Sequence, residues 1–378
     1  MLEYHSLVVA QIRPEASDAV CISFEVPRAL RETYRFHPGQ HLGLRAVIDG
    51  MEQRRTYSIC SGMDEPRLRI GVREHAHGSM SRYLARRLRV GDRIDVLAPA
   101  GRFFVRVDPV AARHYVAFAA GSGITSILGI VKNVLAQAPH SHVTVFYGNR
   151  RADTIMFADE LLGQKDRYPA RLALSFILSR EFQDVDLLNG RLDAAKVAEL
   201  AAARLFDPRR VDGFFLCGPG TMIDVVRGAL VGLGVEAVRI HSERFIGDAP
   251  VAPARMQTQS ASIRSVAPRD ADLSVAAADE LRAATGTQVT VVMDGRRRSF
   301  PAERNGETVL EAAERAGLEL PYSCRAGVCS TCRTRVVRGA VSMTANYALE
   351  AWELDAGYVL CCQALPETDE LELNYDER

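Results

Sequence analysis

The chain has 378 residues, of which 47% are hydrophobic and 25% are charged, an ordinary balance for a globular protein. This length predicts two to four domains. Lys and Arg total 47 and so do Asp and Glu, so the formal net charge is zero. That balance argues against nucleic acid as a bulk partner and against a polybasic membrane anchor.

The N-terminal segment lacks the basic region and long apolar core of a signal peptide. The most apolar stretch, Val116–Val131, is too short and too interrupted by glycine to span a membrane. Four of the eight cysteines, Cys21, Cys60, Cys217 and Cys361, show no disulfide framework. We therefore expect a protein of the reducing cytoplasm.

Residues 1–107 show short strand patterns separated by turn residues. One helical pattern, Ser79–Leu88, interrupts them and places Met80 and Leu84 on one face. Short strands at regular spacing predict a small antiparallel β-barrel. The strand patterns cover His5–Ile12, Ala19–Glu25, Gln40–Val47 and Arg67–Val72.

Residues 108–246 follow a different pattern, in which apolar runs of strand length alternate with helical segments. Near-continuous apolar strands separated by helices predict an α/β domain, with a parallel sheet covered by helices on both faces. The runs are His114–Ala119, His142–Tyr147, Arg171–Leu178, Gly213–Cys217 and Ala237–Ser242.

Residues 247–286 are rich in Ala, Pro, Ser, Asp and Gln without clear periodicity, which predicts a flexible linker. A third domain, residues 287–378, begins with a strand from Gln288, an Asp294-Gly295 turn and a second strand, a hairpin signal. The helix Thr308–Ala316 follows, so we expect an α+β domain.

The most specific motif is a set of four cysteines near the C-terminus. Cys324, Cys329 and Cys332 form C-x4-C-x2-C, and Cys362 follows after 29 intervening residues. This is the plant-type ferredoxin spacing for a [2Fe–2S] cluster, which needs two thiolates on each iron. We predict that these four cysteines are the cluster ligands.

The small residues of this loop, Ser323, Ala326, Gly327 and Ser330, allow backbone N–H groups to approach the cluster sulfides. A zinc site or a disulfide pair is the alternative. Zinc sites usually show C-x2-C pairs or histidine ligands, and neither pattern fits this segment well. Cys361, beside the fourth ligand, is expected to be a packed thiol.

The barrel region contains two short motifs. Arg55-Thr56-Tyr57-Ser58 ends an extended segment. Alone it is a weak signal, and a basic strand end is the alternative. Gly78-Ser79-Met80-Ser81 opens the helical pattern, and a helix N-terminus favours an anion. An ordinary serine-capped helix is the alternative for the second motif.

Two glycine-containing turns lie in the α/β region. Gly121-Ser122-Gly123-Ile124-Thr125-Ser126 follows an apolar strand and opens a helix, the context that a dinucleotide diphosphate needs. Cys217-Gly218-Pro219-Gly220 ends the fourth parallel strand, at the carboxyl edge where ligands bind in open α/β sheets. A buried, inert thiol is the alternative for Cys217.

These motifs, in this order, resemble those of the ferredoxin–NADP reductase superfamily, here fused to a C-terminal ferredoxin module. Further segments resemble the reductase subunits of phenylacetyl-CoA epoxidases. These segments are Tyr4-His5-Ser6-Leu7, Tyr34-Arg35-Phe36-His37-Pro38-Gly39-Gln40-His41, Tyr147-Gly148-Asn149-Arg150 and Tyr358-Val359-Leu360-Cys361-Cys362-Gln363-Ala364-Leu365-Pro366.

The resemblance implies an FAD-binding barrel, an NADPH-binding α/β domain and a ferredoxin domain that feeds a di-iron oxygenase, here one that epoxidises phenylacetyl-CoA in phenylacetate degradation. Electrons would pass from NADPH to FAD and then to the cluster. Flavin connects the two because it accepts a hydride and releases electrons singly. The alternatives are the reductase of another mono- or dioxygenase, or a non-catalytic redox carrier or sensor.

The resemblance also implies roles for barrel residues. Arg55 would hold the FAD phosphate, Tyr57 would line the isoalloxazine, and Ser58 would hydrogen-bond near the nitrogen that accepts the hydride. Gly78 and Ser81 would bind the pyrophosphate. Thr56, Ser79 and Met80 belong to the same two motifs and are expected to contribute to cofactor binding.

In the α/β domain, Gly121, Gly123 and Thr125 would hold the nicotinamide cofactor, and Cys217, followed by Gly218 and Pro219, would lie beside the nicotinamide. Glu243 would lie near the flavin where the domain ends. One departure is Ser126, where the family commonly carries proline, which puts the rigidity of that turn in question.

The choice of nicotinamide cofactor is expected to depend on Ser179 and Arg180, at the carboxyl edge of the third parallel strand. A hydroxyl and a guanidinium can hold the 2′-phosphate of NADPH. Glu181 follows, and an acidic residue at a ribose site would favour NADH. A solvated strand end is the alternative. Related reductases with a similar Ser-Arg pair generally use NADPH, so we expect NADPH, with NADH possible.

Overall fold

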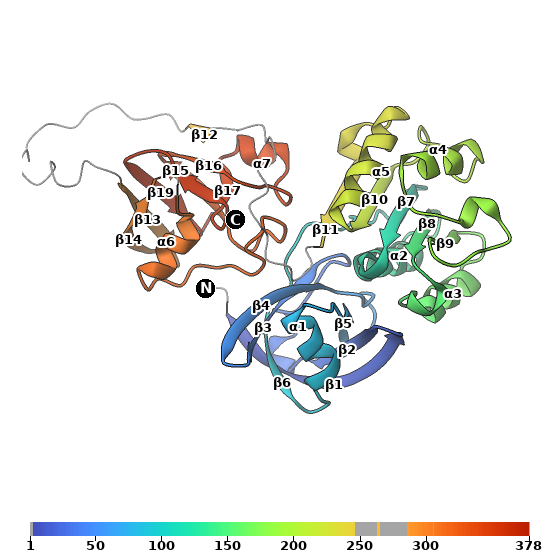
Figure 1. The fold of residues 1–378 in the computed structure, drawn as a ribbon, viewed down its shortest axis with the longest axis horizontal. Helices are drawn as coiled ribbons and strands as arrows, with labels where there is room; N and C mark the ends of the chain where they lie inside the picture. Colours follow the sequence, from blue (N-terminus) through green and yellow to red (C-terminus); the bar gives the residue numbers. More distant parts are fainter. Residues whose placement is uncertain (1–2, 246–262, 265–285, 305, 378) are drawn as a thin grey trace, which may run out of the picture. The chain divides into compact units, whose positions relative to one another are not determined.

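The computed structural model describes residues 3–245, 263–264, 286–304 and 306–377. The chain divides into two compact units, an N-terminal unit of Glu3–Ala249 and a C-terminal unit that contains Pro250–Arg378. Figure 1 labels the elements of both units.

The N-terminal unit begins with a six-stranded antiparallel sheet in the order β4-β3-β6-β1-β2-β5. A bridge between Ile59 and Ile70 joins the segment after β4 to β5, so the two edges of the sheet meet. The predicted barrel is confirmed. Its strands are β1 (Tyr4–Ala16), β2 (Ala19–Glu25), β3 (His41–Ile48), β4 (Met51–Ser58), β5 (Leu68–Arg73) and β6 (Arg93–Leu97).

The barrel interior is a cluster of buried aliphatic side chains that includes Leu7, Ile22 and Leu42. The helical pattern predicted over Ser79–Leu88 forms as helix α1 (Ser79–Arg82) and a π-helical turn η2 (Tyr83–Arg87). Its apolar residues anchor it to this core, because Met80 and Leu84 are fully buried.

The second domain of this unit is a five-stranded parallel sheet in the order β11-β10-β7-β8-β9. Its elements are β7 (His114–Ala120), β8 (His142–Asn149), β9 (Leu172–Leu178), β10 (Gly213–Gly218), β11 (Ile240–Arg244), α2 (Ile124–Gln137), α3 (Ala158–Arg167), α4 (Ala194–Ala202) and α5 (Gly220–Gly232).

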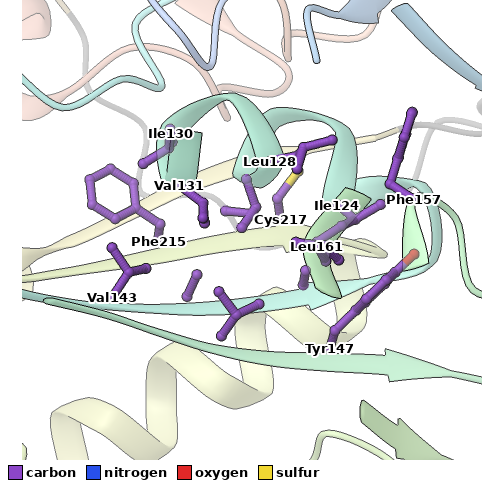
Figure 2. Packing of buried hydrophobic residues seen from close by; sticks show 14 of the residues in the cluster. Ile124, Leu128, Ile130, Val131, Val143, Tyr147, Phe157, Leu161, Phe215 and Cys217 are labelled. Atoms are coloured by element: carbon purple, nitrogen blue, oxygen red, sulfur yellow. The ribbon is translucent and has the colours of Figure 1, made fainter. Parts of the chain in front are cut away.

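Helices cover both faces of this sheet, as predicted. Phe215 and Cys217 of β10 face α2 in one buried cluster, and Figure 2 shows them beside Leu128. Phe214 and Leu216 point to the other face, where α4 and α5 pack. Successive residues of a strand point to opposite faces, so an almost continuous apolar run is what a sheet buried on both sides requires.

The last parallel strand differs from its prediction. Ala237–Arg239 forms a 3-10 turn, and β11 runs from Ile240 to Arg244 rather than from Ala237 to Ser242. The apolar residues of the turn, Ala237 and Val238, are exposed, and parallel pairing with β10 begins only at Ile240. Strand β11 therefore carries Glu243 next to Cys217.

The C-terminal unit contains a mixed five-stranded sheet in the order β14-β13-β19-β15-β17 and a smaller sheet in the order β12-β16-β18. Its elements are β12 (Ile263–Arg264), β13 (Gly286–Met293), β14 (Arg296–Glu303), β15 (Arg333–Arg338), β16 (Ala340–Met343), β17 (Tyr358–Leu360), β18 (Ala364–Pro366), β19 (Glu370–Asn374), α6 (Val309–Arg315) and α7 (Ala351–Asp355).

The predicted hairpin and helix of this unit are both present. Asp294 and Gly295 adopt positive φ angles of 53° and 69°, as a tight hairpin turn between β13 and β14 requires. Thr308 caps α6 by accepting from the backbone N–H of Glu311, which in turn accepts from that of Thr308. The α+β fold of this unit is confirmed.

The linker predicted over residues 247–286 lies almost entirely outside the described residues. Two residues within it, Ile263 and Arg264, pair with Val341 and Ala340 of β16. The bounds of the three domains and of the linker remain predictions. Among the described residues, no helix is long and apolar enough to cross a membrane.

Candidate electron-transfer sites

A cleft in the N-terminal unit gathers side chains from the barrel and from the parallel-sheet domain. Of the residues predicted to bind cofactors, those lining it are Arg55, Thr56, Tyr57, Ser58, Ser81 and Thr125. Strand β4 delivers the first four in sequence, and α1 and α2 deliver the other two. The two barrel motifs, which were weak signals separately, therefore meet at one place.

The donors of this cleft fit a flavin dinucleotide. Arg55 offers a guanidinium for phosphate, Ser58 and Ser81 offer hydroxyls, and the Tyr57 ring offers an apolar wall. Gly71 of β5 lies at the same place, where an added Cβ would fall 2.4 Å from the Thr125 methyl group. The barrel and the parallel-sheet domain thus approach each other closely at this point of the cleft.

Three other members of the barrel motifs do not line the cleft. Met80 is fully buried and packs in the barrel core, so only its backbone is available to a cofactor. Gly78 and Ser79 precede it at the start of α1. These residues can reach a phosphate only from the helix start, since the apolar face of α1 is fixed to the core.

Glu243 lies at the centre of a second group of predicted residues. Its Oε2 accepts from Ser58 Oγ at 3.1 Å and from Ser126 Oγ. Cys217 Sγ lies 3.9 Å from the same oxygen, and His41 Nδ1 lies 3.6 Å from Oε1. The carboxylate thus joins β3 and β4 of the barrel to α2 and β10 of the parallel-sheet domain.

Cys217 is fully buried within this group. Burial, reinforced by the neighbouring Glu243 carboxylate, raises the pKa of Cys217 well above that of a free thiol. The thiol is therefore protonated at neutral pH and acts as a small neutral group, 3.7 Å from Ser126 Oγ. This environment excludes a thiolate nucleophile.

The two glycine turns of the parallel-sheet domain are tightly packed. A Cβ on Gly123 would fall 2.1 Å from the backbone oxygen of Cys217, and Gly218, with φ of +152°, has no room beside Met222. Glycine at these positions lets the start of α2 approach the end of β10. Thr125 donates to the Ser122 carbonyl at 2.8 Å, which fixes the turn between Gly121 and α2.

Ser179 and Arg180, which are predicted to bind the 2′-phosphate of NADPH, directly follow β9. Ser179 donates through Oγ to the Asn149 carbonyl at 3.3 Å, and the Arg180 N–H donates to the Arg150 carbonyl. The side chain of Arg180 is exposed, whereas the Glu181 carboxylate accepts from the Ala152 N–H at 2.9 Å. The acidic residue that complicated the prediction is thus held against a neighbouring loop.

In the C-terminal unit, the segment that carries the first three predicted cluster ligands adopts an unusual backbone. Arg325, Gly327 and Ser330 have φ angles of 55°, 73° and 51°. Alternation of left-handed and ordinary residues turns successive N–H groups toward one side of a loop. One of these groups, the Ala326 N–H, donates to Cys324 Sγ at 3.4 Å.

The four predicted ligands interact with one another. Hydrogen bonds with the thiols of Cys329 and Cys362 lower the pKa of Cys324 well below its ordinary value. Cys332 in turn interacts with Cys362 and with Cys361. Four thiols gathered in one loop and one strand junction, with N–H donors beside them, fit a [2Fe–2S] cluster.

In the described part of the chain, no group of three or more His, Cys, Asp or Glu side chains is arranged to hold one metal ion. A two-iron cluster spreads its four thiolates over two metal atoms.

Three family models together match most of the chain. The oxidoreductase FAD-binding domain matches residues 6–105, the oxidoreductase NAD-binding domain residues 118–228, and the 2Fe-2S iron-sulfur cluster binding domain residues 291–367. One of the subunits of 1,2-phenylacetyl-CoA epoxidase from Escherichia coli (strain K12) is 41% identical, over 100% of this chain and 99% of that protein.

The chain belongs to the ferredoxin–NADP reductase superfamily. The ferredoxin reductase component of 3-ketosteroid-9-alpha-monooxygenase from Rhodococcus rhodochrous is 31% identical, over 98% of this chain and 96% of that protein. The phthalate dioxygenase reductase structure has the same fold, with a TM-score of 0.56 and 20% identity over 98% of each chain.

This reductase is an NAD(P)H-dependent flavin iron–sulfur oxidoreductase that uses FAD and a [2Fe–2S] cluster, as predicted from its motifs. When bound, the flavin takes a two-electron hydride and passes electrons singly to the cluster. The residues around Glu243 link the barrel to the parallel-sheet domain.

Several residues of the reductase that line these sites were missed by the sequence analysis. His41 and Ser126 contact Glu243, yet neither had an assigned role. The cleft also contains Gly71, Arg73, His75, Ser122 and Phe245. Phe245 had a usable signal, since it stands two residues after Glu243, and Ser122 lies in the glycine motif that opens α2. Gly71, Arg73 and His75 lie in or just after a strand that carries no such motif.

Proposed function

We propose that this reductase takes electrons from NADPH and delivers them through FAD and the [2Fe–2S] cluster to the di-iron oxygenase of a phenylacetyl-CoA epoxidase, in the cytoplasm. The observation that carries the proposal is the identity of 41% with the matching component of that epoxidase, over 100% of this chain and 99% of that protein. The match extends over all three domains.

A second candidate is the reductase component of a different oxygenase. The relative from the 3-ketosteroid monooxygenase is 31% identical over almost the same length. The cofactor motifs are the same for both candidates, so only residues outside those motifs distinguish them. The higher identity favours the epoxidase.

Reconstitution tests the proposal directly. The purified reductase is combined with NADPH, phenylacetyl-CoA and the oxygenase components of the epoxidase, and the epoxide is measured. A parallel reaction contains the oxygenase of the 3-ketosteroid system and its steroid. Product in the first reaction alone supports the proposal, and product in the second alone would transfer the function to the second candidate.

For the site residues, we propose that Ser58, Cys217 and Glu243 surround the atoms that exchange the hydride. Ser58 and Cys217 both approach the Glu243 carboxylate, so their positions relative to the flavin and the nicotinamide are linked. In the C-terminal unit we propose that Cys324, Cys329, Cys332 and Cys362 hold the cluster. We also propose that the remaining predicted residues of the two barrel motifs and the two glycine turns bind FAD and the nicotinamide cofactor.

We propose a preference for NADPH, supported by the exposed guanidinium of Arg180 and by the backbone contact that holds Glu181. Changing Arg180 to Ala should remove one charge-assisted phosphate contact, which costs about 1.5–3 kcal/mol. That corresponds to roughly ten- to a hundredfold in selectivity for NADPH over NADH. The measurement is kcat/KM for both cofactors, and equal values in the unmodified reductase would contradict the preference.

A further inference from the structure

His41 is the first residue of β3 and lies directly opposite Ser58 of β4. Residues directly opposite in an antiparallel pair present their side chains on the same face, about 4.5–5.5 Å apart at Cβ. The imidazole therefore enters the group around Glu243 from the same side as the Ser58 hydroxyl. Its side chain is 6% exposed, and that of Glu243 is 11% exposed.

The two oxygens of Glu243 are held differently. Ser58, Ser126 and Cys217 all approach Oε2, whereas His41 Nδ1 approaches Oε1 at 3.6 Å. Contacts to Oε2 alone leave the carboxylate free to turn about its last torsion, because that torsion has a broad energy profile. A group beside Oε1 fixes the plane of the carboxylate.

The imidazole of His41 is itself fixed from behind. A Cβ on Gly101 would fall 2.8 Å from His41 Nδ1, so the ring packs directly on the backbone of that glycine, whose φ is +102°. The backbone of His41 pairs with Ala100 in both directions, at 2.9 and 3.0 Å. The backbone of His41 is thus fixed, and Gly101 packs against the Nδ1 edge of the ring, the edge that faces Glu243.

The other ring nitrogen of His41, Nε2, is buried and has no hydrogen-bond partner in the described part of the chain. Buried polar atoms are normally satisfied. The polar contact of this ring is thus the one with Glu243, and no competing partner explains why a histidine lies at this position.

We propose that His41 is a positioning residue that acts through Glu243. By facing Oε1 it keeps Oε2 in contact with the hydroxyls of Ser58 and Ser126. It thereby fixes the position of Ser58, in the barrel, relative to Cys217, in the parallel-sheet domain. This inference rests on the proposed role of Glu243 in hydride exchange. His41 is not among the residues that line the cleft, whereas Ser58, opposite it in the neighbouring strand, is.

Three substitutions of His41 test the proposal in the FAD-loaded reductase, with stopped-flow reduction of the flavin by NADPH as the readout. His41→Leu removes both nitrogens and should slow reduction by about 10- to 100-fold, the cost of misplacing reacting groups. His41→Asn places a donor near Nδ1 and should recover most of the rate. His41→Gln places its amide near Nε2 and should not. The exposed His140→Leu is the matched control.

A double-mutant cycle with Glu243→Gln separates positioning from a structural role. If His41 acts through Glu243, His41→Leu should change the rate by less than about twofold in the Glu243→Gln background. Equal effects in both backgrounds would overturn the proposal. The dissociation constant of NADP⁺, followed by its flavin difference spectrum, should stay within about twofold in every His41 variant.

A larger change in NADP⁺ affinity would mean that His41 supports the domain interface in general, and would also overturn the proposal. Should His41→Leu fail to retain FAD, the comparison of His41→Asn with His41→Gln decides alone: a faster Asn variant supports positioning, and equal rates refute it. Failure of the unmodified reductase to oxidise NADPH would instead refute the proposed function, so the two failures are distinguishable.

Discussion

The two units of this reductase build their redox sites in opposite ways. In the C-terminal unit, three of the four predicted cluster ligands lie between Cys324 and Cys332 on one loop. In the N-terminal unit, Glu243 contacts Ser58, which is 185 residues away in sequence, and Ser126, which is 117 residues away. The first site is held by one loop and one later cysteine, whereas the second exists only where two domains meet.

The two sites also differ in what makes them rigid. The cluster loop is shaped by its own backbone, with three left-handed residues and a close approach of Gly327 to the Ala345 carbonyl. The Glu243 site depends on the docking of the barrel on the parallel-sheet domain. A buried ionic network reinforces that docking, in which Lys132 and Arg69 both contact Glu65 and Glu160.

Loss of a cluster ligand should give the largest effect and should be confined to the C-terminal unit. Changing Cys329 to Ser removes a thiolate that a buried hydroxyl cannot replace, so we expect loss of the cluster and of electron transfer to a protein acceptor. Reduction of the flavin by NADPH should be unchanged. Visible absorption and iron content measure the loss of the cluster, and stopped-flow absorbance measures the reduction of the flavin.

The matched control is Cys361→Ser, beside the fourth ligand. Cys361 is fully buried, and its N–H donates to the Cys332 carbonyl, a contact that the substitution keeps. The variant should retain the cluster. If it lost the cluster while Cys362→Ser kept it, the ligand assignment would be wrong.

In the N-terminal unit, Cys217→Ala should slow hydride transfer by about 10- to 100-fold while changing the affinity for the nicotinamide cofactor much less. The thiol lies beside Glu243, and burial keeps it protonated. Its expected role is therefore to fill space and hold its neighbours in place, rather than to act as a nucleophile. Stopped-flow reduction and cofactor titration measure the two quantities. Cys60→Ala, another buried thiol, is the control, and an unchanged rate in Cys217→Ala would make Cys217 an inert thiol.

Breaking the domain contact should destabilise the N-terminal unit alone. Burial opposes ionisation of Glu160, but the charges of Lys132 and Arg69 outweigh it and hold the pKa of Glu160 below 4.5. Glu160→Gln should cost about 1–3 kcal/mol at neutral pH, because two largely buried cations lose a partner and Glu65 compensates only in part. Calorimetry of the full chain measures the loss.

The stability effect of Glu160→Gln should depend on pH, and its sign follows from the lowered pKa of Glu160. The stabilisation by Glu160 is present above pH 4.5 and is lost as the pH falls through the lower folded-state pKa, so the difference from the Gln variant should shrink in acid. Asp159→Asn, one residue earlier in α3 and exposed, should cost less than about 0.5 kcal/mol. An equal loss in both variants would show that the network contributes nothing specific.

The smallest effect should come from the cap of α6 in the C-terminal unit. Thr308→Ala removes the hydroxyl that accepts from the Glu311 N–H and should cost about 1 kcal/mol. The hydrophobic cluster of this unit contains no residue of the N-terminal unit, so only one of two melting transitions should move. Thr308→Ser keeps the acceptor and should restore stability; a shift of both transitions would contradict the separation.

Much of this reductase could be predicted from its sequence, because the signals are local. The C-x4-C-x2-C spacing, the Asp294-Gly295 hairpin and the alternation of apolar strands with helices each act over a few residues, and each gave the correct fold. The resemblance to a known superfamily then supplied the order of the domains and the cofactors, which the family models confirm.

The environment of individual side chains was decided by tertiary structure alone. Met80 lay inside a cofactor motif, but the helix that carries it turns it into the barrel core. Ser126 stood out only as a departure from the family, and the structure gives it a contact with Glu243. His41 stood in a segment that resembles the family but had no role of its own, because its role depends on a residue that docks from another domain.

The sequence by itself therefore determined which cofactors this protein carries and in which domains, since loops and strand patterns form from neighbouring residues. Only the tertiary structure decided which groups surround Glu243. Strand β11 carries Glu243 to the place where β10, α2 and the barrel strands β3 and β4 converge, and that place depends on sheet order and domain packing. Contacts between residues far apart in sequence are set by the folded chain, which no spacing encodes.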